Sequence, residues 1–194
     1  YRKERLVNYC TYCGTSFSDL EVDYVEEEGA LWHLRYPLSD NAEDALFVAT
    51  TRPETMLGDV AVAVHPQDDR YSAYIGKTVR LPLVDRDIPV IADEMVDPEF
   101  GTGVVKITPA HDENDWQVAQ RHDLSLIPVI DFKGRMTDRS GPFAGQKVKA
   151  AREAVVSALQ EEASLVKVEK HTHRVGTCYK CKRIIEPLPL EQWF

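Results

Sequence analysis

The fold at the centre of the chain is decided by one stretch, GTGVVKITPAHDENDW, at residues 101–116. Residues 103–108 are rich in β-branched side chains and predict a strand, because Val, Ile and Thr suit a pleated sheet. Pro109 follows that strand. Residues 112–121 then have an acidic start and a basic end at Arg121, which favours a helix through its dipole. We therefore expect a strand that leads directly into a helix.

Polar side chains gather on both of these elements. Lys106 and Thr108 share one face of the expected strand. Asp112 and Asp115 are three positions apart and share one face of the helix. Together they would place an ammonium group, a hydroxyl and two carboxylates at the mouth of one pocket. A structural explanation has equal weight, in which Asp112 is the helix N-cap and Asp115 its capping-box partner.

His111 lies between these two groups. It has the chemistry of a general base or a metal ligand, but a lone histidine after Pro-Ala is more often a hydrogen-bonded structural residue. The sequence has no Gly-x-Ser-x-Gly nucleophile elbow. The short Gly-Thr-Gly at residues 101–103 precedes a strand rather than a helix, so it does not predict a phosphate-binding loop.

Upstream, residues 50–59 form a second polar stretch, TTRPETMLGD, at the end of a predicted strand. It holds three threonine hydroxyls, a guanidinium and two carboxylates within ten residues. We expect these groups to contribute to a site; the candidates are Thr50, Thr51, Arg52, Thr55 and Asp59. The same stretch also fits a capped helix start, with Thr50 or Thr51 as the N-cap and Glu54 as its partner.

Short strands with closely spaced turns make up most of the remaining pattern. Apolar residues alternate over 20–24 and again over 32–38, on both sides of the acidic stretch 26–29, and this predicts a hairpin. Further strands are expected at 45–50, 78–83, 88–92, 103–108 and 125–130. Residues 147–163 carry an amphipathic stripe typical of a scaffold helix. The sequence thus predicts a mixed α/β fold with a β-barrel-like domain and flanking helices.

Four cysteines form two Cys-x-x-Cys pairs near opposite ends of the chain. The pairs are Cys10 with Cys13 and Cys178 with Cys181, and 164 residues lie between them. Two such pairs complete the four-sulfur shell that Zn²⁺ prefers, whereas disulfides are rare in cytosolic proteins. We expect a structural zinc in a ribbon-like neck formed by the two chain ends. That geometry is typical of a domain inserted into a larger host.

Composition and charge narrow the class of protein. Hydrophobic residues make up 43% and charged residues 28% of 194 residues, which is typical of a globular chain. The net charge of −9 argues against a general nucleic-acid binder. Basic residues nevertheless concentrate near the ends, with six Lys and Arg against two Glu in residues 166–186. No apolar run reaches the length of a membrane span, so we expect a cytoplasmic chain without a membrane partner, cut from a longer protein.

The stretches at 49–55 and 101–112 resemble the editing domain inserted in class I aminoacyl-tRNA synthetases for branched aliphatic amino acids. The wording KITPAHD at 106–112 is most similar to the valyl enzymes, and so are residues 62–68, 75–77 and 178–194. The resemblance therefore covers nearly the whole chain. The His-Ile-Gly-His and Lys-Met-Ser-Lys-Ser signatures of amino-acid activation are absent from the sequence.

The resemblance implies a role for each candidate residue. Asp115 would hold the α-ammonium of a mischarged amino acid, and Asp112 would help fix the amino acid or its hydroxyl. Lys106 and Thr108 would read the side chain and the RNA end, and they complete the catalytic set. Substrate-binding roles would fall to Thr50, Thr51, Arg52, Thr55, Asp59 and His111. The resemblance implies neither a metal nor a covalent intermediate at this site.

The resemblance also implies an organisation and partners. Residues 1–18 and 170–194 would form the zinc-ribbon neck, joined to the host, and residues 19–169 the editing domain. The partners would be the 3′ end of mischarged tRNA(Val) and the remainder of the synthetase in cis. Two alternatives stay open: an editing domain of the isoleucyl or leucyl type, and a non-catalytic zinc-ribbon module that binds RNA or a protein.

Overall fold

The computed structural model describes residues 2–193, and the side chains of residues 4–191. Tyr1 and Phe194, which belong to the predicted neck, lie outside the described residues. The strands are β1 (Arg2–Cys10), β2 (Thr15–Phe17), β3 (Val22–Pro37), β4 (Ala45–Thr50), β5 (Ala61–Val64), β6 (Thr78–Leu81), β7 (Arg86–Ala92), β8 (Val104–Ile107), β9 (Leu165–Cys178) and β10 (Glu186–Trp193). The α-helices are α1 (Glu113–His122) and α2 (Val148–Glu161), and the 3₁₀ helices are η1 (Asp19–Glu21), η2 (Pro53–Gly58), η3 (Ser72–Tyr74) and η4 (Asp138–Phe143).

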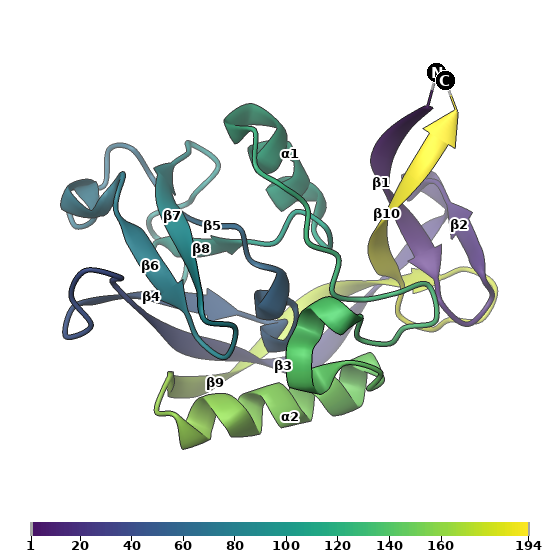
Figure 1. Ribbon diagram of the computed structural model, residues 1–194. Coiled ribbons are helices and arrows are strands. Elements are labelled where there is room, and N and C mark those ends of the chain that lie inside the picture. Colours follow the sequence, from purple (N-terminus) through teal and green to yellow (C-terminus); the bar gives the residue numbers. More distant parts are fainter. Residues whose placement is uncertain (1, 194) are drawn as a thin grey trace.

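Three sheets organise these elements. The first has the strand order β10-β1-β2, the second β4-β3-β9, and the third β6-β7-β5-β8. The first sheet is the neck: it lies to one side of the body, and the two chain ends come together at its tip (Figure 1). β1 and β10 pair antiparallel from Arg2 with Trp193 to Tyr9 with Glu186.

The body is built from the second and third sheets. A single bridge between Leu38 and Val79 connects them on one side, and β4 lies beside β8 on the other. Between them lies the main core, which includes Leu34, Tyr36 and Val48, all with no exposed surface. The helix α2 covers β3 and β9 from below (Figure 1) and buries Ala151, Val155 and Leu159. The fold is therefore mixed and rich in sheet.

The mixed, sheet-rich class is as predicted, but the expected barrel does not close. Within residues 2–193 no closed barrel forms, because β4 and β8 share no ladder of backbone hydrogen bonds. The predicted strands at 45–50, 78–83, 88–92 and 103–108 correspond to β4, β6, β7 and β8, and the two predicted helices to α1 and α2. The zinc-ribbon part of the predicted fold stays a prediction.

Two local predictions are wrong. Residues 26–29 are not a hairpin turn, because β3 continues through them as one strand of 16 residues. Residues 125–130 make only the isolated bridge of Ile130 with Met136. The sequence analysis also missed β5, β9 and the neck strands β1 and β10. The division at residues 18/19 and 169/170 stays a prediction, and β9 runs through the second boundary without a break.

None of the described helices has the length and apolar character needed to cross a membrane.

Candidate active site

A network of polar side chains lies buried where β8 meets the end of η2. Lys106 Nζ donates to Thr55 Oγ1 at 2.9 Å, to Asp59 Oδ1 at 3.3 Å, and to Thr108 Oγ1. Thr108 Oγ1 in turn donates to Asp59 Oδ1 at 2.6 Å, and Tyr36 OH donates to Asp59 Oδ2 at 2.7 Å. The Lys106 ammonium thus uses all three of its hydrogens inside the protein.

Local sequence explains why Asp59 points into the core. Pro53 begins η2, because the fixed φ of proline suits a first helical position. Every residue of η2 is buried. Gly58 ends it at a close approach: a Cβ there would lie 2.7 Å from the carbonyl oxygen of Ile127. The next residue, Asp59, has no exposed surface. Burial raises the pKa of Asp59. The charge of Lys106 and the hydrogen bonds that Thr108 and Tyr36 donate to Asp59 oppose that rise.

Asp112 and Asp115 have different surroundings. Asp112 is the N-cap of α1, and its Oδ1 accepts from the backbone N–H of Asn114 at 2.8 Å and of Asp115 at 3.0 Å. Asp115 is not its capping-box partner. Its Oδ2 accepts instead from the backbone N–H of Thr108 at 2.8 Å, while its Oδ1 accepts from none of the described residues.

The Asp115 carboxyl is 7% exposed. Burial, together with the neighbouring Asp112, raises its pKa to about 8. An empty site therefore holds this carboxyl largely protonated at neutral pH. A cation placed beside it would favour the ionised form, because an opposite charge lowers the pKa of a carboxyl group. Such a group is suited to hold an ammonium ion.

His111 is a hydrogen-bonded structural residue, the alternative to a role as general base or metal ligand. It is 2% exposed, and its Nε2 accepts from the backbone N–H of Val129 at 2.9 Å, while Nδ1 lies 3.2 Å from the carbonyl oxygen of Pro187. Burial lowers its pKa to about 3. The ring is therefore neutral, and both of its nitrogens are engaged inside the protein.

A chain of ion pairs crosses the body next to the Thr-rich stretch. Arg52 Nη2 donates to Glu186 Oε2 at 2.6 Å, and Arg52 Nε to Glu54 Oε1 at 3.3 Å. Arg152 binds both oxygens of Glu54, at 2.8 and 2.9 Å. Glu54 has no exposed surface. The predicted cap at this position is wrong: Arg52 is the N-cap of η2, and the carboxylate of Glu54 binds arginines.

The sequence analysis missed three of the residues involved, namely Tyr36, Arg152 and Glu186. Arg152 lies four positions after Val148 and three before Val155, so it interrupts the apolar stripe of α2. A charge on a buried stripe needs a partner, and this was the available signal. Tyr36 and Glu186 left no comparable signal, because their partners are distant in sequence.

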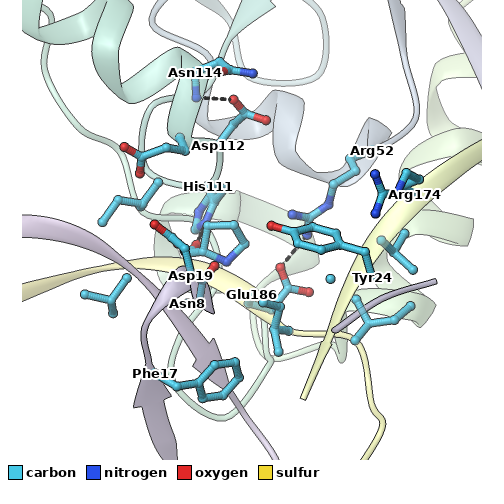
Figure 2. A pocket seen from close by; sticks show the side chains of 18 of the residues that line it. Asn8, Phe17, Asp19, Tyr24, Arg52, His111, Asp112, Asn114, Arg174 and Glu186 are labelled. Atoms are coloured by element: carbon cyan, nitrogen blue, oxygen red, sulfur yellow. Dashed lines mark hydrogen bonds and ion pairs between the residues drawn. The ribbon is translucent and has the colours of Figure 1, made fainter. Parts of the chain in front are cut away.

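A cleft of about 920 Å³ opens between the neck and the body. Thr51, Arg52, His111 and Asp112 line it, and Figure 2 shows Arg52 with Glu186 on one side and Asp112 at the start of α1 on the other. The predicted site residues therefore form two layers. One layer faces the cleft; the other is the buried network of Thr55, Asp59, Lys106 and Thr108. Thr50 is buried, and its Oγ1 accepts from the backbone N–H of Arg52 at 3.0 Å.

The four cysteines come together at the base of the neck. Their Sγ atoms all lie within 4.8 Å of one another, and the distances are 3.5 Å from Cys10 to Cys181 and 4.0 Å from Cys13 to Cys178. None is in a disulfide. Tetrahedral Zn–S bonds of about 2.3 Å imply sulfur–sulfur distances of about 3.8 Å. The four thiols therefore fit a zinc ion, with each sulfur supplying one ligand.

Comparisons with known proteins agree with this geometry. Residues 67–171 match the family described as "Leucyl-tRNA synthetase, editing domain". The crystal structure of GlLeuRS-CP1 superposes with a TM-score of 0.56, covering 73% of this chain and 99% of that one, at 17% sequence identity. The family match spans more than half of the chain. The chain therefore belongs to the editing-domain family of class I aminoacyl-tRNA synthetases.

Within that family, the chain is similar over its full length to valine–tRNA ligases. It is 53% identical to the enzyme of Fervidobacterium nodosum, 51% to that of Thermotoga maritima and 53% to that of Dehalococcoides mccartyi. These matches place it with the editing domains of valyl-tRNA synthetases. The chain spans 22% of the length of each of these relatives.

The substitution Asp115→Asn should remove a pH dependence of stability. The folded chain keeps a proton on Asp115 up to about pH 8, whereas the unfolded chain loses it near pH 4. The free energy of unfolding therefore falls as the pH rises toward 8, by at most about 1.4 kcal/mol per pH unit. Between about pH 6.5 and 8 the variant should gain about 2 kcal/mol relative to the wild type, measured by urea unfolding.

The difference between the variant and the wild type isolates Asp115, because the other titrating groups, including Cys178 with its pKa lowered to about 7, are common to both chains. The lowered pKa of His111 affects stability only below about pH 6.5, where the unfolded chain binds the extra proton. Asp138→Asn, at an exposed position, is the matched control and should follow the wild type. Parallel stability curves for Asp115→Asn and the wild type would show that this carboxyl does not hold the extra proton.

Proposed function

We propose that this chain is the post-transfer editing hydrolase domain of a valyl-tRNA synthetase, which deacylates mischarged threonyl-tRNA(Val). The observation that carries the proposal is the Asp115 carboxyl, buried at the start of α1 with one oxygen that accepts no hydrogen bond from the described residues. The full-length similarity to valine–tRNA ligases supports valine as the cognate amino acid. The proposed substrate is the ester that joins threonine to the terminal adenosine of the tRNA.

The need for this activity follows from the shapes of two amino acids. Threonine has the shape of valine, with a hydroxyl in place of a methyl group. For this pair of amino acids, an apolar pocket is known to reject threonine by only about 10². A second site that hydrogen-bonds the hydroxyl accepts threonine and spares valine, because valine would leave buried polar groups unpaired.

Thr51, Arg52 and Asp112, which line the cleft, would bind the two ends of the ester together with Asp115, which follows the lining residue Asn114 on α1. Asp115 would take the α-ammonium through its free oxygen, and Asp112, whose Oδ1 caps α1, would offer Oδ2 to the amino acid or its hydroxyl. Thr51 and Arg52 line the cleft and would contact the terminal adenosine. Thr50 would contribute indirectly, by accepting a hydrogen bond from the backbone N–H of Arg52.

The buried layer would fix the shape of this site. Thr55, Asp59, Lys106 and Thr108 hold η2 against β8 through mutual hydrogen bonds. For Lys106 and Thr108 to touch the substrate, as their proposed catalytic role requires, one of these bonds would have to be exchanged for a bond to the ligand. His111 would contribute by holding residues 129–130 and β10.

The proposed reaction is the attack of a water molecule on the ester carbonyl carbon. The bond from that carbon to the ribose oxygen breaks, and a proton from the water passes to this oxygen, which leaves as the ribose hydroxyl while the amino acid leaves with a free carboxyl group. Ester hydrolysis has a lower barrier than amide hydrolysis, so positioning and charge stabilisation suffice for the protein's part. The step as proposed uses neither a metal nor a covalent enzyme intermediate.

We further propose that Cys10, Cys13, Cys178 and Cys181 hold a structural zinc ion. Four thiolates complete the coordination of zinc and leave no position for a reacting water molecule. The ion would join the β1–β2 turn to the β9–β10 turn, so that residues 1–18 and 170–194 act as a neck to the editing domain of residues 19–169. In the cytoplasm, the remainder of the synthetase would attach through this neck in cis.

Deacylation of a panel of mischarged tRNAs tests the proposed activity. The chain should hydrolyse threonyl-tRNA(Val) and leave valyl-tRNA(Val) intact. Asp115→Ala should lower kcat/KM about 100-fold or more, because it removes a buried charged partner of the substrate. Asp138→Ala, at an exposed position, is the control and should keep full activity.

Three results of that panel would contradict the proposal in different ways. Equal hydrolysis of both esters would remove the specificity for threonine. Preference for an isoleucine or leucine tRNA would assign the domain to another synthetase. Binding of tRNA without any hydrolysis would leave the non-catalytic zinc-ribbon module as the explanation.

Elemental analysis tests the zinc site independently of activity. The purified chain should contain about one zinc ion per molecule, and Cys178→Ser should lower both that content and the thermal midpoint of unfolding. Ser157→Ala, on the exposed side of α2, is a control that should change neither. A reduced, metal-free chain that unfolds at the same temperature as the zinc-loaded one would exclude a structural metal.

A further inference from the structure

Two adjacent residues of the neck touch both motif stretches of the body. Glu186 and Pro187 begin β10, which pairs with β1 across the neck. Glu186 accepts from Arg52, in the stretch at 50–59, at 2.6 Å. The carbonyl oxygen of Pro187 lies 3.2 Å from Nδ1 of His111, in the stretch at 101–116. One dipeptide thus contacts residues of both motif stretches that line the cleft. Figure 2 shows Glu186 with its partner Arg52, and His111 nearby.

Arg52 is fixed between two carboxylates that come from different parts of the fold. Glu186 binds its Nη2 from the neck, and Glu54 binds its Nε from η2. The Glu186 side chain is 10% exposed and that of Glu54 is fully buried. Arg152 of α2 binds Glu54 with two hydrogen bonds, so carboxylates and guanidinium groups alternate from Glu186 to Arg152. Because these charges are shielded from water, removing one would leave its partner poorly compensated.

The position of Arg52 also sets the position of the buried network. The carbonyl oxygen of Arg52 accepts from the backbone N–H of Thr55 at 3.1 Å and from Thr55 Oγ1 at 2.9 Å. Thr55 Oγ1 in turn accepts from Lys106 at 2.9 Å. A path of hydrogen bonds therefore runs from the neck strand through Arg52 to the layer behind the cleft.

We propose that Glu186 is a positioning residue for the editing reaction, and that it acts by holding Arg52 in place at the cleft. This inference rests on the proposed deacylase activity. Glu186 does not need to touch the reacting ester; its carboxylate fixes the guanidinium that does the binding. Because Glu186 is part of the neck, this ion pair couples the orientation of the neck to the substrate cleft.

A double-mutant cycle tests the proposal. Glu186→Gln should lower kcat/KM for threonyl-tRNA(Val) about tenfold, and Arg52→Gln more strongly. If Glu186 acts through Arg52, the double variant should be no slower than Arg52→Gln alone, because the shared pathway is already lost. Losses that multiply in the double variant would overturn the proposal, since they would show that Glu186 acts independently of Arg52.

Glu169→Gln is the matched control. Glu169 also lies on a neck-proximal strand, β9, and also pairs with basic side chains, Lys167 at 2.5 Å and His33 at 2.9 Å. It has no contact with Arg52, so its substitution should leave kcat/KM unchanged. Urea unfolding of all variants sets the assay temperature at which each is folded.

Amide hydrogen exchange gives a second readout that needs no activity. Glu186→Gln should speed exchange of the backbone N–H groups of Thr55 and Asp59, which are bonded at 3.1 and 2.9 Å, while β5 keeps its protection. Unchanged exchange at residues 52–59 would overturn the coupling. If the wild type hydrolyses no ester, the proposed activity fails, and the exchange result still decides whether Glu186 fixes this segment.

Discussion

The packing of the body depends on the buried ion pair between Lys106 and Asp59. Each charge taken out of water costs several kcal/mol, and the attraction between the two offsets this only when the remaining hydrogen-bonding groups are also satisfied. Thr55, Thr108 and Tyr36 satisfy them. Their positions require that η2 ends beside Ile107, at the end of β8, and that β3 passes behind both. The backbone bond from Val60 N–H to the carbonyl oxygen of Ile107 fixes this register, and β5 continues from it.

A network satisfied in this way is rigid, and this explains the separation of the site into two layers. The buried layer has few free donors, because the Lys106 ammonium and the Thr108 hydroxyl bind each other and Asp59. The groups left for a ligand are at its edge, where Asp115 and Asp112 begin α1. The backbone N–H of Thr108 joins the layers by donating to Asp115. The carboxyl groups left for a ligand are therefore held in place by β8 and Thr108, which cannot shift without breaking the ion pair between Lys106 and Asp59.

The sequence was informative about what is local and uninformative about what is cross-strand. The strand-to-helix stretch at 101–116 and the amphipathic α2 were predictable, because their periodicity and capping residues lie within a few positions. The acidic stretch in β3 was misread as a turn. In the β3–β9 ladder Glu26 lies opposite Arg174, Glu27 opposite His173 and Gly29 opposite His171, so pairing with β9 carries the strand through the acidic stretch. Gly29 makes room for the ring of His173, since a Cβ there would lie 2.7 Å from Cε1. The sequence of β3 or of β9 taken alone does not reveal this pairing. Glu186 escaped for the same reason, because its partner Arg52 is 134 positions away.

The same cross-strand pairing bears on how the neck is attached. A two-stranded connection twists easily about its axis, and β1 and β10 alone would allow the chain ends to swing relative to the cleft. Contacts at two places bear on this motion. The four cysteines bring the β1–β2 turn against the β9–β10 turn. Eight residues after Cys178, Glu186 pairs with Arg52 and Pro187 meets His111, so that β10 is joined to the body. Separated points of attachment fix an orientation, whereas one would fix only a position. Arg52, a residue of the body, thus connects the neck strand β10 to the cleft.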